Sequence, residues 1–372
     1  MIAYIILPIF LLIPIGIYLY FYFLRIADFW GIKLKSIQIK IASIFLTLLA
    51  VIFSANLFGV GALIIFHIVA VALCMEILNF IFVALHKKKG IKINIWNKLF
   101  RCGFIPIIIA SMILGYGYYN MKNVVKTDYT VHTRKAIRDQ GYKIAMISDL
   151  HFGTTMNEKE LMKYCKEIED NKPDIVALCG DIVDERTNLL QMKNAAKLLG
   201  NIKSTYGTYY IYGNHDKATY SATPSFDENQ LKNELERNGV HVLQDEIYKV
   251  NGELTIIGRK DKGFSSEINR KTSKELLQNA DVNNFLLLLD HQPSELKQNS
   301  LEGIDLQLSG HTHAGQIWPE GLFNKVLGIG ELNYGYKRIG NYQIIVSSGI
   351  GGWGYPIRTG SHSEYVIVNV KR

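Results

Sequence analysis

The sequence predicts an N-terminal transmembrane region of four helices followed by an α/β domain. The first 121 of the 372 residues contain four long apolar runs, and the remainder alternates apolar strands with helical segments. Charge divides at the same place: residues 1–121 hold 10 Lys and Arg against 2 Asp and Glu, and residues 122–372 hold 31 of each class. The net charge of +8 therefore belongs to the first third, so the domain lacks the basic excess that would predict a nucleic-acid partner.

Each apolar run has the length of a membrane span, which needs about 20 apolar residues. The first run contains no charged residue, and the third is interrupted only by His67 and Glu76. Buried core helices of a soluble protein are a poor alternative, because four such runs fall within 121 residues. The predicted spans are residues 1–24, 41–58, 62–85 and 103–121.

Lysine and arginine in the connecting loops predict the orientation of the spans. The loops after the first and third spans are basic, including Lys33 and Lys35 in one and Lys87 and Lys88 in the other, whereas the loop after the second span carries no charge. Short cytoplasmic loops carry the excess of Lys and Arg. We therefore expect a multi-pass protein of the cell membrane, with everything after residue 121 on the extracytoplasmic side.

Two features of the composition bear on function. Glu76 is ionisable and lies in the middle of the third span, where such groups are functional candidates by default. It can also snorkel, or pair with His67 or with another helix. The four cysteines form no CxxC pair, so the sequence predicts neither a disulfide framework nor a zinc knuckle.

Residues 122–141 predict a linker and a first strand, and the domain itself is expected at residues 142–372. In its first half strands alternate with helices, which predicts a sheet covered by helices. In its second half strands dominate, which predicts a second sheet packed on the first. The predicted strands are 142–151, 174–181, 208–216, 240–244, 247–251, 253–260, 284–291, 304–309, 342–348 and 364–370, and the predicted helices are 157–171, 188–200 and 227–238.

Five polar segments end predicted strands, at the positions where functional residues gather in open α/β sheets. Their candidate ligands are of metal-binding types: carboxylates, imidazoles and one carboxamide, Asn214. Each residue alone has an ordinary explanation as a helix cap, a turn residue or a structural histidine. Those ordinary explanations would have to hold independently at all five strand ends, which makes a shared functional site the better explanation. The segments are SDLHFG (148–153), GDIVD (180–184), GNHD (213–216), DHQP (290–293) and GHTHAGQ (310–316).

This mixture of ligands suits two divalent ions such as Mn, Fe or Zn rather than a metal that prefers thiolates. Two metals about 3.5–4 Å apart need a bridging carboxylate and can clamp an in-line displacement at phosphorus. They also lower the pKa of a bridging water, so that an attacking hydroxide exists near neutral pH. A neighbouring histidine can then protonate the leaving oxygen. The segments therefore predict hydrolysis of a phosphoric ester.

The five segments resemble, in order, the motifs of the calcineurin-like metallophosphoesterases: D-x-H, GD-x-x-D, GNH followed by D or E, a single H, and GH-x-H. The resemblance covers about residues 142–372. Residues 347–365 are similar to the tail of the membrane-associated branch, which includes bacterial phosphodiesterases and lipid-precursor pyrophosphatases. The resemblance implies a four-layer α/β/β/α sandwich with a dimetal site at one edge.

The resemblance also implies a role for each matching residue. His215 would be the general acid, oriented by Asp216, and Asp184 would be a structural hydrogen-bonding residue. Arg358, in the glycine-rich tail, is a candidate contact for the substrate phosphate, the alternative being an ordinary surface arginine. Asp181 would bridge the two metals. Metal one would be held by Asp149, His151, Asp181 and His313, and metal two by Asp181, Asn214, His291 and His311.

The sequence thus predicts a membrane-anchored, extracytoplasmic phosphoesterase that hydrolyses a phosphodiester or a pyrophosphate. The alternatives are a phosphomonoesterase or nucleotide pyrophosphatase acting on soluble substrates, and a membrane sensor or transport component with an accessory phosphoesterase domain. No protein partner can be inferred. Aromatic rings with a polar edge favour the membrane–water interface, so membrane lipids and an amphiphilic or lipid-linked substrate are expected partners. The late-loop aromatic residues are Trp318, Phe323, Tyr334, Tyr336, Trp353 and Tyr355.

Overall fold

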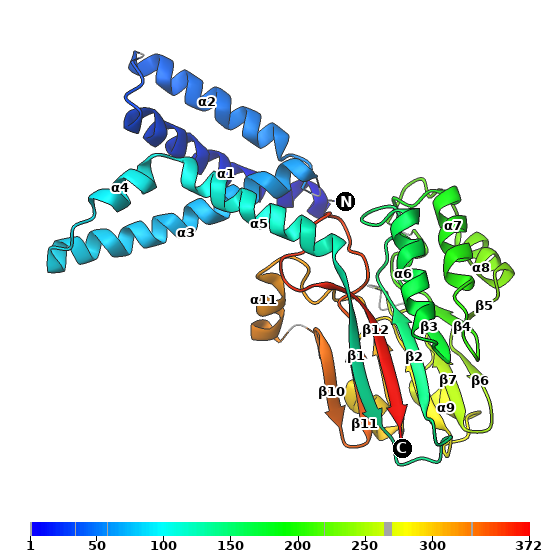
Figure 1. Ribbon diagram of the computed structural model, residues 1–372. Helices are drawn as coiled ribbons and strands as arrows, with labels where there is room; N and C mark the ends of the chain where they lie inside the picture. The colour runs from blue at the N-terminus through cyan, green and yellow to red at the C-terminus, as the bar shows by residue number, and fades with distance from the viewer. Residues whose placement is uncertain (1, 34, 58, 219, 264–269, 329) are drawn as a thin grey trace. The chain divides into compact units, whose positions relative to one another are not determined.

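The computed structural model describes residues 2–33, 35–57, 59–218, 220–263, 270–328 and 330–372 (Figure 1). Contacts divide the chain into two compact units, Met1–Tyr116 and Gly117–Arg372. The boundary falls inside a helix, so the second unit begins with helical residues. Each unit is described here by itself.

The first unit is helical, and four of its helices are long and apolar enough to cross a membrane. Between 11% and 28% of each apolar window is buried inside the protein, as expected of helices that face lipid. The second helix lies five residues earlier than the predicted span, because the polar residues around Ser54 and Asn56 favour a turn. The helices are α1 (Ile2–Phe29), α2 (Ser36–Phe53), α3 (Val60–Lys89), the short α4 (Asn94–Arg101) and α5 (Phe104–Lys122), which continues into the second unit.

Glu76 of α3 has a partner within the first unit. Its carboxylate forms an ion pair with Arg25 of α1 and accepts a hydrogen bond from the Tyr18 hydroxyl at 3.2 Å. His67, considered above as a partner, instead contacts Leu63 O through Nδ1 at 2.7 Å. A paired charge costs much less in an apolar environment than an isolated one, so the ion pair gives Glu76 a structural role.

Two six-stranded mixed sheets form the centre of the second unit. Neighbouring strands β2 to β5 run parallel in sheet 1, as do β7, β8, β9 and β11 in sheet 2. Sheet 1, in the order β1-β12-β2-β3-β4-β5, contains β1 (Val124–His132), β2 (Tyr142–Ile147), β3 (Ile175–Cys179), β4 (Thr208–Ile211), β5 (Val240–Val242) and β12 (Ser363–Lys371). Sheet 2, in the order β10-β11-β9-β8-β7-β6, contains β6 (Glu246–Lys249), β7 (Leu254–Gly258), β8 (Phe285–Leu289), β9 (Leu306–Ser309), β10 (Gly335–Ile339) and β11 (Tyr342–Val346).

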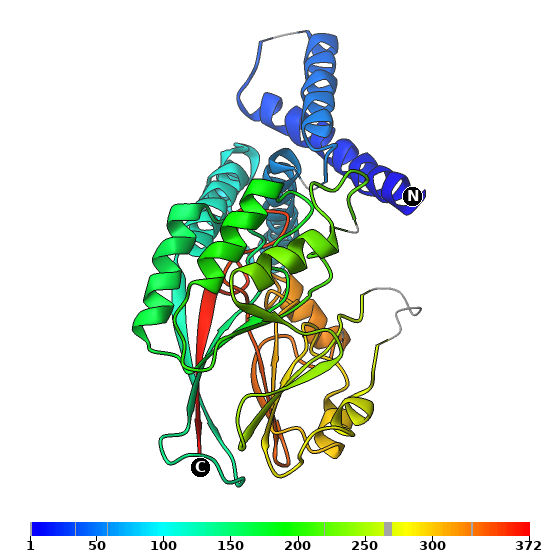
Figure 2. The same cartoon turned by 90° about the vertical axis from the view of Figure 1, so that its right-hand side faces the viewer.

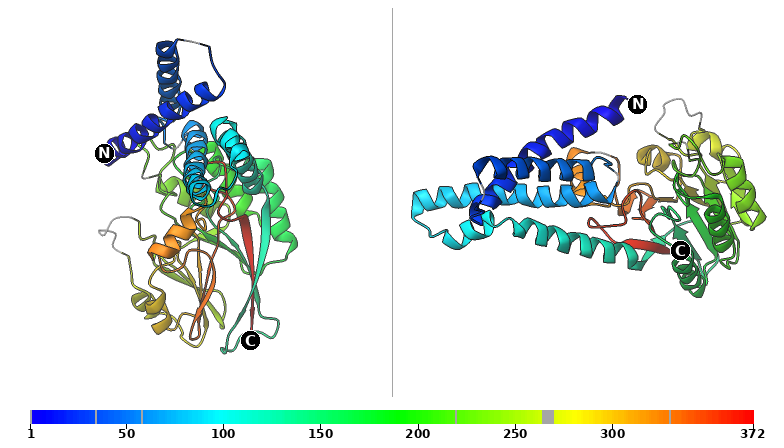
Figure 3. Two further views of the ribbon diagram at one scale, coloured as in Figure 1. Left: turned by 90° about the vertical axis from the view of Figure 1, so that its left-hand side faces the viewer. Right: turned by 90° about the horizontal axis from the view of Figure 1, so that it is seen from above.

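Helices cover the outer face of each sheet. Figure 2 and the left panel of Figure 3 view the layers edge-on from opposite sides, with green helices outside sheet 1 and yellow helices outside sheet 2. This arrangement is the four-layer α/β/β/α sandwich that the resemblance implies. The helices are α6 (Glu158–Asp170), α7 (Leu189–Gly200) and α8 (Glu228–Arg237) on sheet 1, and α9 (Ser273–Leu277) and α10 (Leu296–Leu301) on sheet 2.

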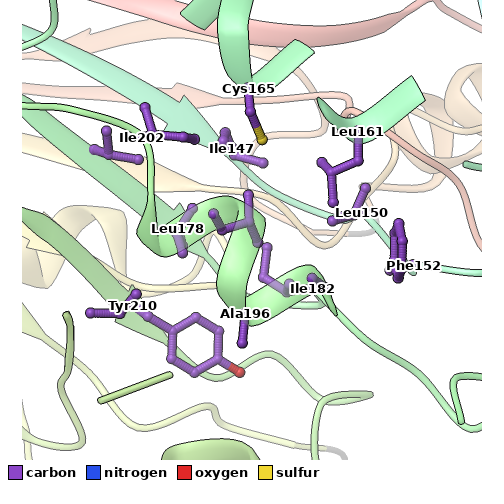
Figure 4. Close-up of a cluster of buried hydrophobic side chains, with 14 of the residues drawn as sticks. Ile147, Leu150, Phe152, Leu161, Cys165, Leu178, Ile182, Ala196, Ile202 and Tyr210 are labelled. Atoms are coloured by element: carbon purple, nitrogen blue, oxygen red, sulfur yellow. The ribbon is translucent and has the colours of Figure 1, made fainter. Parts of the chain in front are cut away.

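Strand residues alternate between two cores, because successive side chains point to opposite faces of a sheet. On β3, Val176 and Leu178 belong to the core beneath the helices of sheet 1, part of which Figure 4 shows, whereas Ala177 belongs to the core between the sheets. On β8, Leu288 faces the helices of sheet 2 and Leu287 faces sheet 1. All of these side chains are fully buried, which holds the strand ends firmly in place.

Several short elements were not predicted from the sequence. They are α4, α9, α10 and β10, and also α11 (Glu320–Leu327), in which no residue is buried. The helix predicted at 157–171 does form as α6. It begins at the expected capping box: Asn157 accepts the Glu160 N–H at 3.1 Å, and the Glu160 carboxylate accepts the Asn157 N–H at 2.8 Å.

Candidate dimetal site

The five motif segments lie in the loops after β2, β3, β4, β8 and β9. The carboxyl ends of parallel strands open at the same edge of a sheet, so these loops meet. Backbone hydrogen bonds join them: Asp149 N–H donates to Gly180 O, and Gly310 N–H donates to His291 O, both at 3.0 Å. The strands end before the motif residues, which leaves the motif side chains on loops held by a rigid scaffold.

The structure brings six of the predicted metal ligands into two clusters. Within each cluster, one ligand atom from each of three residues lies within 4.8 Å of the others. The six residues come from loops of both sheets, so each cluster spans the edge of the sandwich. The first cluster is Asp149, His151 and His313, and the second is Asp181, His291 and His311.

Asp181 lies between the two clusters. Its Oδ2 is 3.1 Å from His291 Nε2 in its own cluster and 3.8 Å from His151 Nε2 in the other. Its Oδ1 accepts the backbone N–H of His215 at 2.9 Å, which fixes the orientation of the carboxylate. A carboxylate in this position can serve two cations at once, which is the role predicted for Asp181.

Asn214, the predicted amide ligand, lies beside the second cluster. Its Oδ1 is 2.8 Å from His311 Nδ1. An oxygen and a nitrogen at this distance share a proton or face one cation. Asn214 is also buried, with 7% of its surface exposed, so its carboxamide is not a solvated turn residue.

Burial keeps two of the histidines neutral. Burial and the charge of His291 lower the pKa of His311 to about 4, and burial lowers the pKa of His313 well below its ordinary value. For Asp181, burial acts to raise the pKa, but His291 and His151 hold the pKa well below its ordinary value. At neutral pH these groups are therefore two neutral imidazoles and a carboxylate, the forms that bind metal ions.

His291 behaves differently because it faces Asp181 directly. Burial acts to lower its pKa, but the Asp181 carboxylate raises that pKa well above its ordinary value. In the metal-free chain His291 therefore carries a proton beside the Asp181 carboxylate. Binding a cation between them would release this proton, so metal affinity at the second cluster should weaken in acid.

Several buried atoms of the ligand residues make no hydrogen bond within the described part of the chain, among them Asp149 Oδ2, His151 Nε2 and His291 Nε2. A buried polar atom without a partner costs about 1–3 kcal/mol, and native proteins contain few of them. Cations at the two clusters would satisfy all three atoms. The donor set of carboxylate, imidazole and amide oxygen suits Mn, Fe or Zn, so the residues present fit the metals that the resemblance implies.

The backbone at the ligands is strained. Left-handed φ values cost non-glycine residues about 1–3 kcal/mol each and are concentrated at functional sites. Glycine is required beside them: a Cβ at Gly310 would lie only 2.2 Å from Asp149 Oδ2. The ligand side chains are thus held where the backbone alone would favour glycine. Their φ values are 53° at Asp149, 43° at His151, 53° at Asp181, 73° at His311 and 49° at His313.

Polar groups behind the ligands face their rings and help to fix the ring orientation. Cys179 O lies 2.8 Å from His291 Nδ1; a carbonyl only accepts, so Nδ1 carries the hydrogen and Nε2 faces the cluster. Asp184 Oδ2 lies 3.3 Å from His151 Nδ1 and accepts a hydrogen bond from the Thr154 hydroxyl at 2.9 Å. Asp184 therefore has the structural role that was expected of it.

His215 lies beside the clusters, and the carboxylate that meets its ring is Glu185. His215 Nδ1 is 2.8 Å from Glu185 Oε1, and the ring centroid is 5.3 Å from that of His151. The sequence prediction assigned this orienting role to Asp216, and the structure corrects it. One signal in the sequence could have identified Glu185: it is an acidic residue directly after the GDIVD metal motif.

Asp216 has a different use, which explains the correction. Its fully buried carboxylate accepts backbone N–H groups from two loops at 2.6–3.1 Å, so no lone pair is directed at the His215 ring. Burial and the neighbouring Asp181 charge raise the pKa of Asp216 to about 6. Asp216 thus joins the loop after β3 to the loop after β4. The donors are Asp181, Ile182, Val183 and Gly213.

Arg358, predicted to contact the substrate phosphate, is fully buried behind the first cluster. Its Nη1 donates to His313 O at 2.8 Å and to Ser361 Oγ at 3.1 Å, and its Nη2 donates to Gly351 O. Burial lowers the pKa of Arg358 to about 10, which leaves it charged at neutral pH. Because no part of this side chain is exposed, its role in the structure is to hold loops together, and a phosphate contact does not fit this geometry.

A four-layer sandwich with two ligand clusters at the carboxyl ends of its strands defines a metal-dependent phosphoesterase. Residues 142–315 match the sequence profile of the family described as calcineurin-like phosphoesterase. The chain is 31% identical over 292 residues to an uncharacterized metallophosphoesterase of Helicobacter pylori, covering 76% of this chain and 72% of that protein. It is 31% identical over 275 residues to another from Aquifex aeolicus, covering 71% and 98%. The chain therefore belongs to the calcineurin-like phosphoesterase family.

A further relative combines the same domain with membrane helices. The transmembrane protein with metallophosphoesterase domain of Danio rerio is 26% identical over 292 residues, covering 73% of this chain and 63% of that protein. Together with the four apolar helices, this similarity indicates that the chain is associated with a membrane.

Replacing Glu185 by Gln should lower the pKa of His215. Burial acts to lower that pKa, but Glu185 and Asp181 raise it above its ordinary value. A general acid works only while protonated, so activity is present below this pKa and is lost as pH rises through it. Without the Glu185 charge, the alkaline limb of kcat/KM should move to lower pH by about 1 unit.

The pH profile of kcat/KM on a nitrophenyl phosphoester measures this shift. Glu246→Gln, at an exposed position on β6, is the matched control and should leave the limb in place. An alkaline limb that is the same in Glu185→Gln and wild type would remove Glu185 from this role.

Proposed function

We propose that this chain is a membrane-anchored, extracytoplasmic phosphoesterase that uses two divalent ions to hydrolyse a phosphodiester or a pyrophosphate of an amphiphilic or lipid-linked substrate. The observation that carries the proposal is the pair of ligand clusters with Asp181 between them and His215 beside them. Two divalent ions bound there supply positive charge to the attacking and leaving oxygens of an in-line displacement at phosphorus.

The chain's own residues would supply the rest of the chemistry. Glu185 accepts the hydrogen of His215 Nδ1, which leaves Nε2 to deliver a proton to the leaving oxygen. The rings of Tyr220 and Trp353 lie 5.1 and 5.2 Å from the His215 ring. They cover part of its surface and so help to exclude water from the proton-transfer step.

A diester is favoured over a monoester by the charge of the site. A phosphomonoester carries a second negative charge near neutral pH. Arg358, in the glycine-rich tail loop, is buried and donates to backbone carbonyls instead of facing substrate. A substrate phosphate with a single charge therefore suits the described residues better.

The rates on bis- and mono-nitrophenyl phosphate test this preference. With added Mn²⁺, the full-length protein should hydrolyse the diester faster than the monoester. Asp181→Asn should lower both rates by at least ~10²-fold, because the shared carboxylate is weakened. A faster rate on the monoester would instead support the phosphomonoesterase alternative.

Exposed apolar side chains near the site support an amphiphilic substrate. Trp318, two residues before α11, is 66% exposed, and Trp353 is 37% exposed beside His215. Such side chains suit the boundary between lipid headgroups and acyl chains. Of the other predicted aromatic residues, Phe323 and Tyr336 are exposed, and Tyr334 and Tyr355 are half-buried. The exposed apolar residues of α11 are Leu322, Phe323, Val326 and Leu327.

Trp318→Ala should lower hydrolysis of a lipid-linked phosphoester in mixed micelles and leave hydrolysis of bis-nitrophenyl phosphate unchanged. The reason is that Trp318 is exposed, whereas Trp353 contacts His215, so Trp353→Ala should lower both rates. Leu190→Ala, at an exposed apolar position on α7, is the control for general surface effects. If Trp318→Ala slows both substrates equally, packing damage rather than loss of lipid contact is the cause.

The positions of basic residues support the extracytoplasmic side for the catalytic unit. Lys33 and Lys35 lie between α1 and α2, and His86–Lys89 form the last turn of α3, whereas the connection between α2 and α3 carries no Lys or Arg. Two basic connections on one face favour that face as cytoplasmic. With four spans, the chain after α5 would then lie on the same side as the N-terminus.

Single cysteines introduced into a background without Cys74 and Cys102 test this topology. Lys159→Cys is suitable because Lys159 is exposed on α6, whereas Asn157 caps that helix. In intact cells an impermeant thiol reagent should label Lys159→Cys, and it should label Lys88→Cys only after permeabilisation. The reverse pattern would place the catalytic unit in the cytoplasm.

A further inference from the structure

The last turns of α5 are hydrogen-bonded to the loop that carries Arg358. Both belong to the second unit. The backbone N–H of Arg358 donates to Gly117 O at 2.9 Å, and Asn120 Nδ2 donates to Arg358 O at 3.0 Å and also to Ser361 O. The backbone of Arg358 is therefore held on both sides by residues of α5. Asn120 is 8% exposed, so water competes little for these hydrogen bonds.

Gly117 allows the helix and the loop to approach this closely. A Cβ at Gly117 would lie 2.8 Å from Thr359 Cγ2 and 3.2 Å from Ile357 Cβ. The first distance is shorter than an ordinary contact, so the helix is packed against the loop as tightly as glycine permits. The loop thus has little freedom to shift relative to the end of α5.

The same loop contacts the first ligand cluster through the Arg358 side chain. The guanidinium donates to His313 O and to Gly351 O, and the Gly351 N–H donates to Asp149 O at 3.1 Å. His313 and Asp149 are both members of the first cluster. Arg358 therefore links the backbones of two ligands that come from different sheets.

We propose that Asn120 is a positioning residue for the first cluster, acting through the backbone of the Arg358 loop and the Arg358 guanidinium on the backbone of His313. The end of the fourth span thereby sets the affinity of the metal held by Asp149, His151 and His313. Ligand geometry must be held within about 0.5 Å for full affinity. The inference rests on the two-ion site proposed above.

Other contacts keep α5 docked when Asn120 is changed. The Ser363 hydroxyl donates to Met121 O at 3.0 Å, and Lys122 Nζ donates to Thr155 O at 2.7 Å and pairs with Glu160 at 2.9 Å. Asn120→Ala should therefore retain the fold and relax only the Arg358 loop. Asn123→Ala, an exposed Asn three residues further on, is the matched control.

Titration of the purified full-length protein with Mn²⁺ measures this effect without any substrate. The wild type and Asn123→Ala should bind two equivalents. Asn120→Ala should bind one of the two about 10-fold more weakly and keep the affinity of the other, since changes behind a ligand typically cost 10–100-fold in metal affinity. Asn120→Asp, which keeps the size but directs a carboxylate at two carbonyl oxygens, should behave no better than Asn120→Ala.

Two backgrounds identify which equivalent is affected. In His311→Ala, where the second cluster is disabled, adding Asn120→Ala should weaken the remaining Mn²⁺ about 10-fold. In His313→Ala, where the first cluster is disabled, adding Asn120→Ala should leave the remaining Mn²⁺ unchanged. Equal loss in both backgrounds would show a general structural effect and overturn the inference, as would wild-type affinities in Asn120→Ala. Wild-type protein that takes up no Mn²⁺ would overturn the two-ion site itself and this inference with it.

Discussion

The position of the Asp181 carboxylate between the two clusters is the constraint on which the second unit depends. Oδ2 can face both clusters only if the loops after β3 and β4 stay in contact, and the Asp216 carboxylate holds them together through four backbone N–H groups. Oδ1 is meanwhile fixed by the His215 N–H, which also places His215 beside the site. The Asp181 carboxylate therefore lies between the ligands of both clusters, and the Asp216 carboxylate holds in place the loop that carries Asp181.

The strained backbone at the ligands lowers the stability of the second unit, and the buried strands of the sandwich hold that backbone in place. Five ligand residues adopt left-handed φ values at about 1–3 kcal/mol each. Together that is comparable with the whole net stability of a domain, about 5–15 kcal/mol. Of the strands that carry the ligand loops, β3, β4, β8 and β9 are buried at every position, and β2 is buried at every position except Lys143. Local strain at their ends can persist because the strands cannot shift to relieve it. Bound cations would also offset the cost of burying ligand atoms without hydrogen-bond partners.

The buried strands and the position of the site could be predicted, because both depend on local sequence patterns. Runs such as those at Ile175–Cys179 and Phe285–Leu289 are apolar at every position, which indicates strands buried on both faces, and the polar segments directly after them mark the site. The partner of His215 was not predictable in this way. Asp216 adjoins His215 in sequence, whereas Glu185 meets it only because the loops after β3 and β4 approach each other. Arg358 was misjudged for the same reason: the sequence cannot show that its guanidinium is enclosed by backbone carbonyls. The edge strand β10 (GYKRI) carries no apolar alternation and forms through pairing with β11.

The boundary between the membrane helices and the catalytic unit shows why hydropathy alone describes this chain incompletely. Residues 117–122 lie in a helix apolar enough to span a bilayer, so composition groups them with the membrane region. Their contacts group them with the second unit, because Gly117 and Asn120 satisfy the backbone polar groups of the Arg358 loop. A buried loop needs such partners. The end of α5 supplies these hydrogen-bonding groups, Gly117 O and Asn120 Nδ2, at positions fixed by the helix, which a flexible linker could not do. The last turns of α5 thus serve as structural partners of the loop that contacts the first cluster.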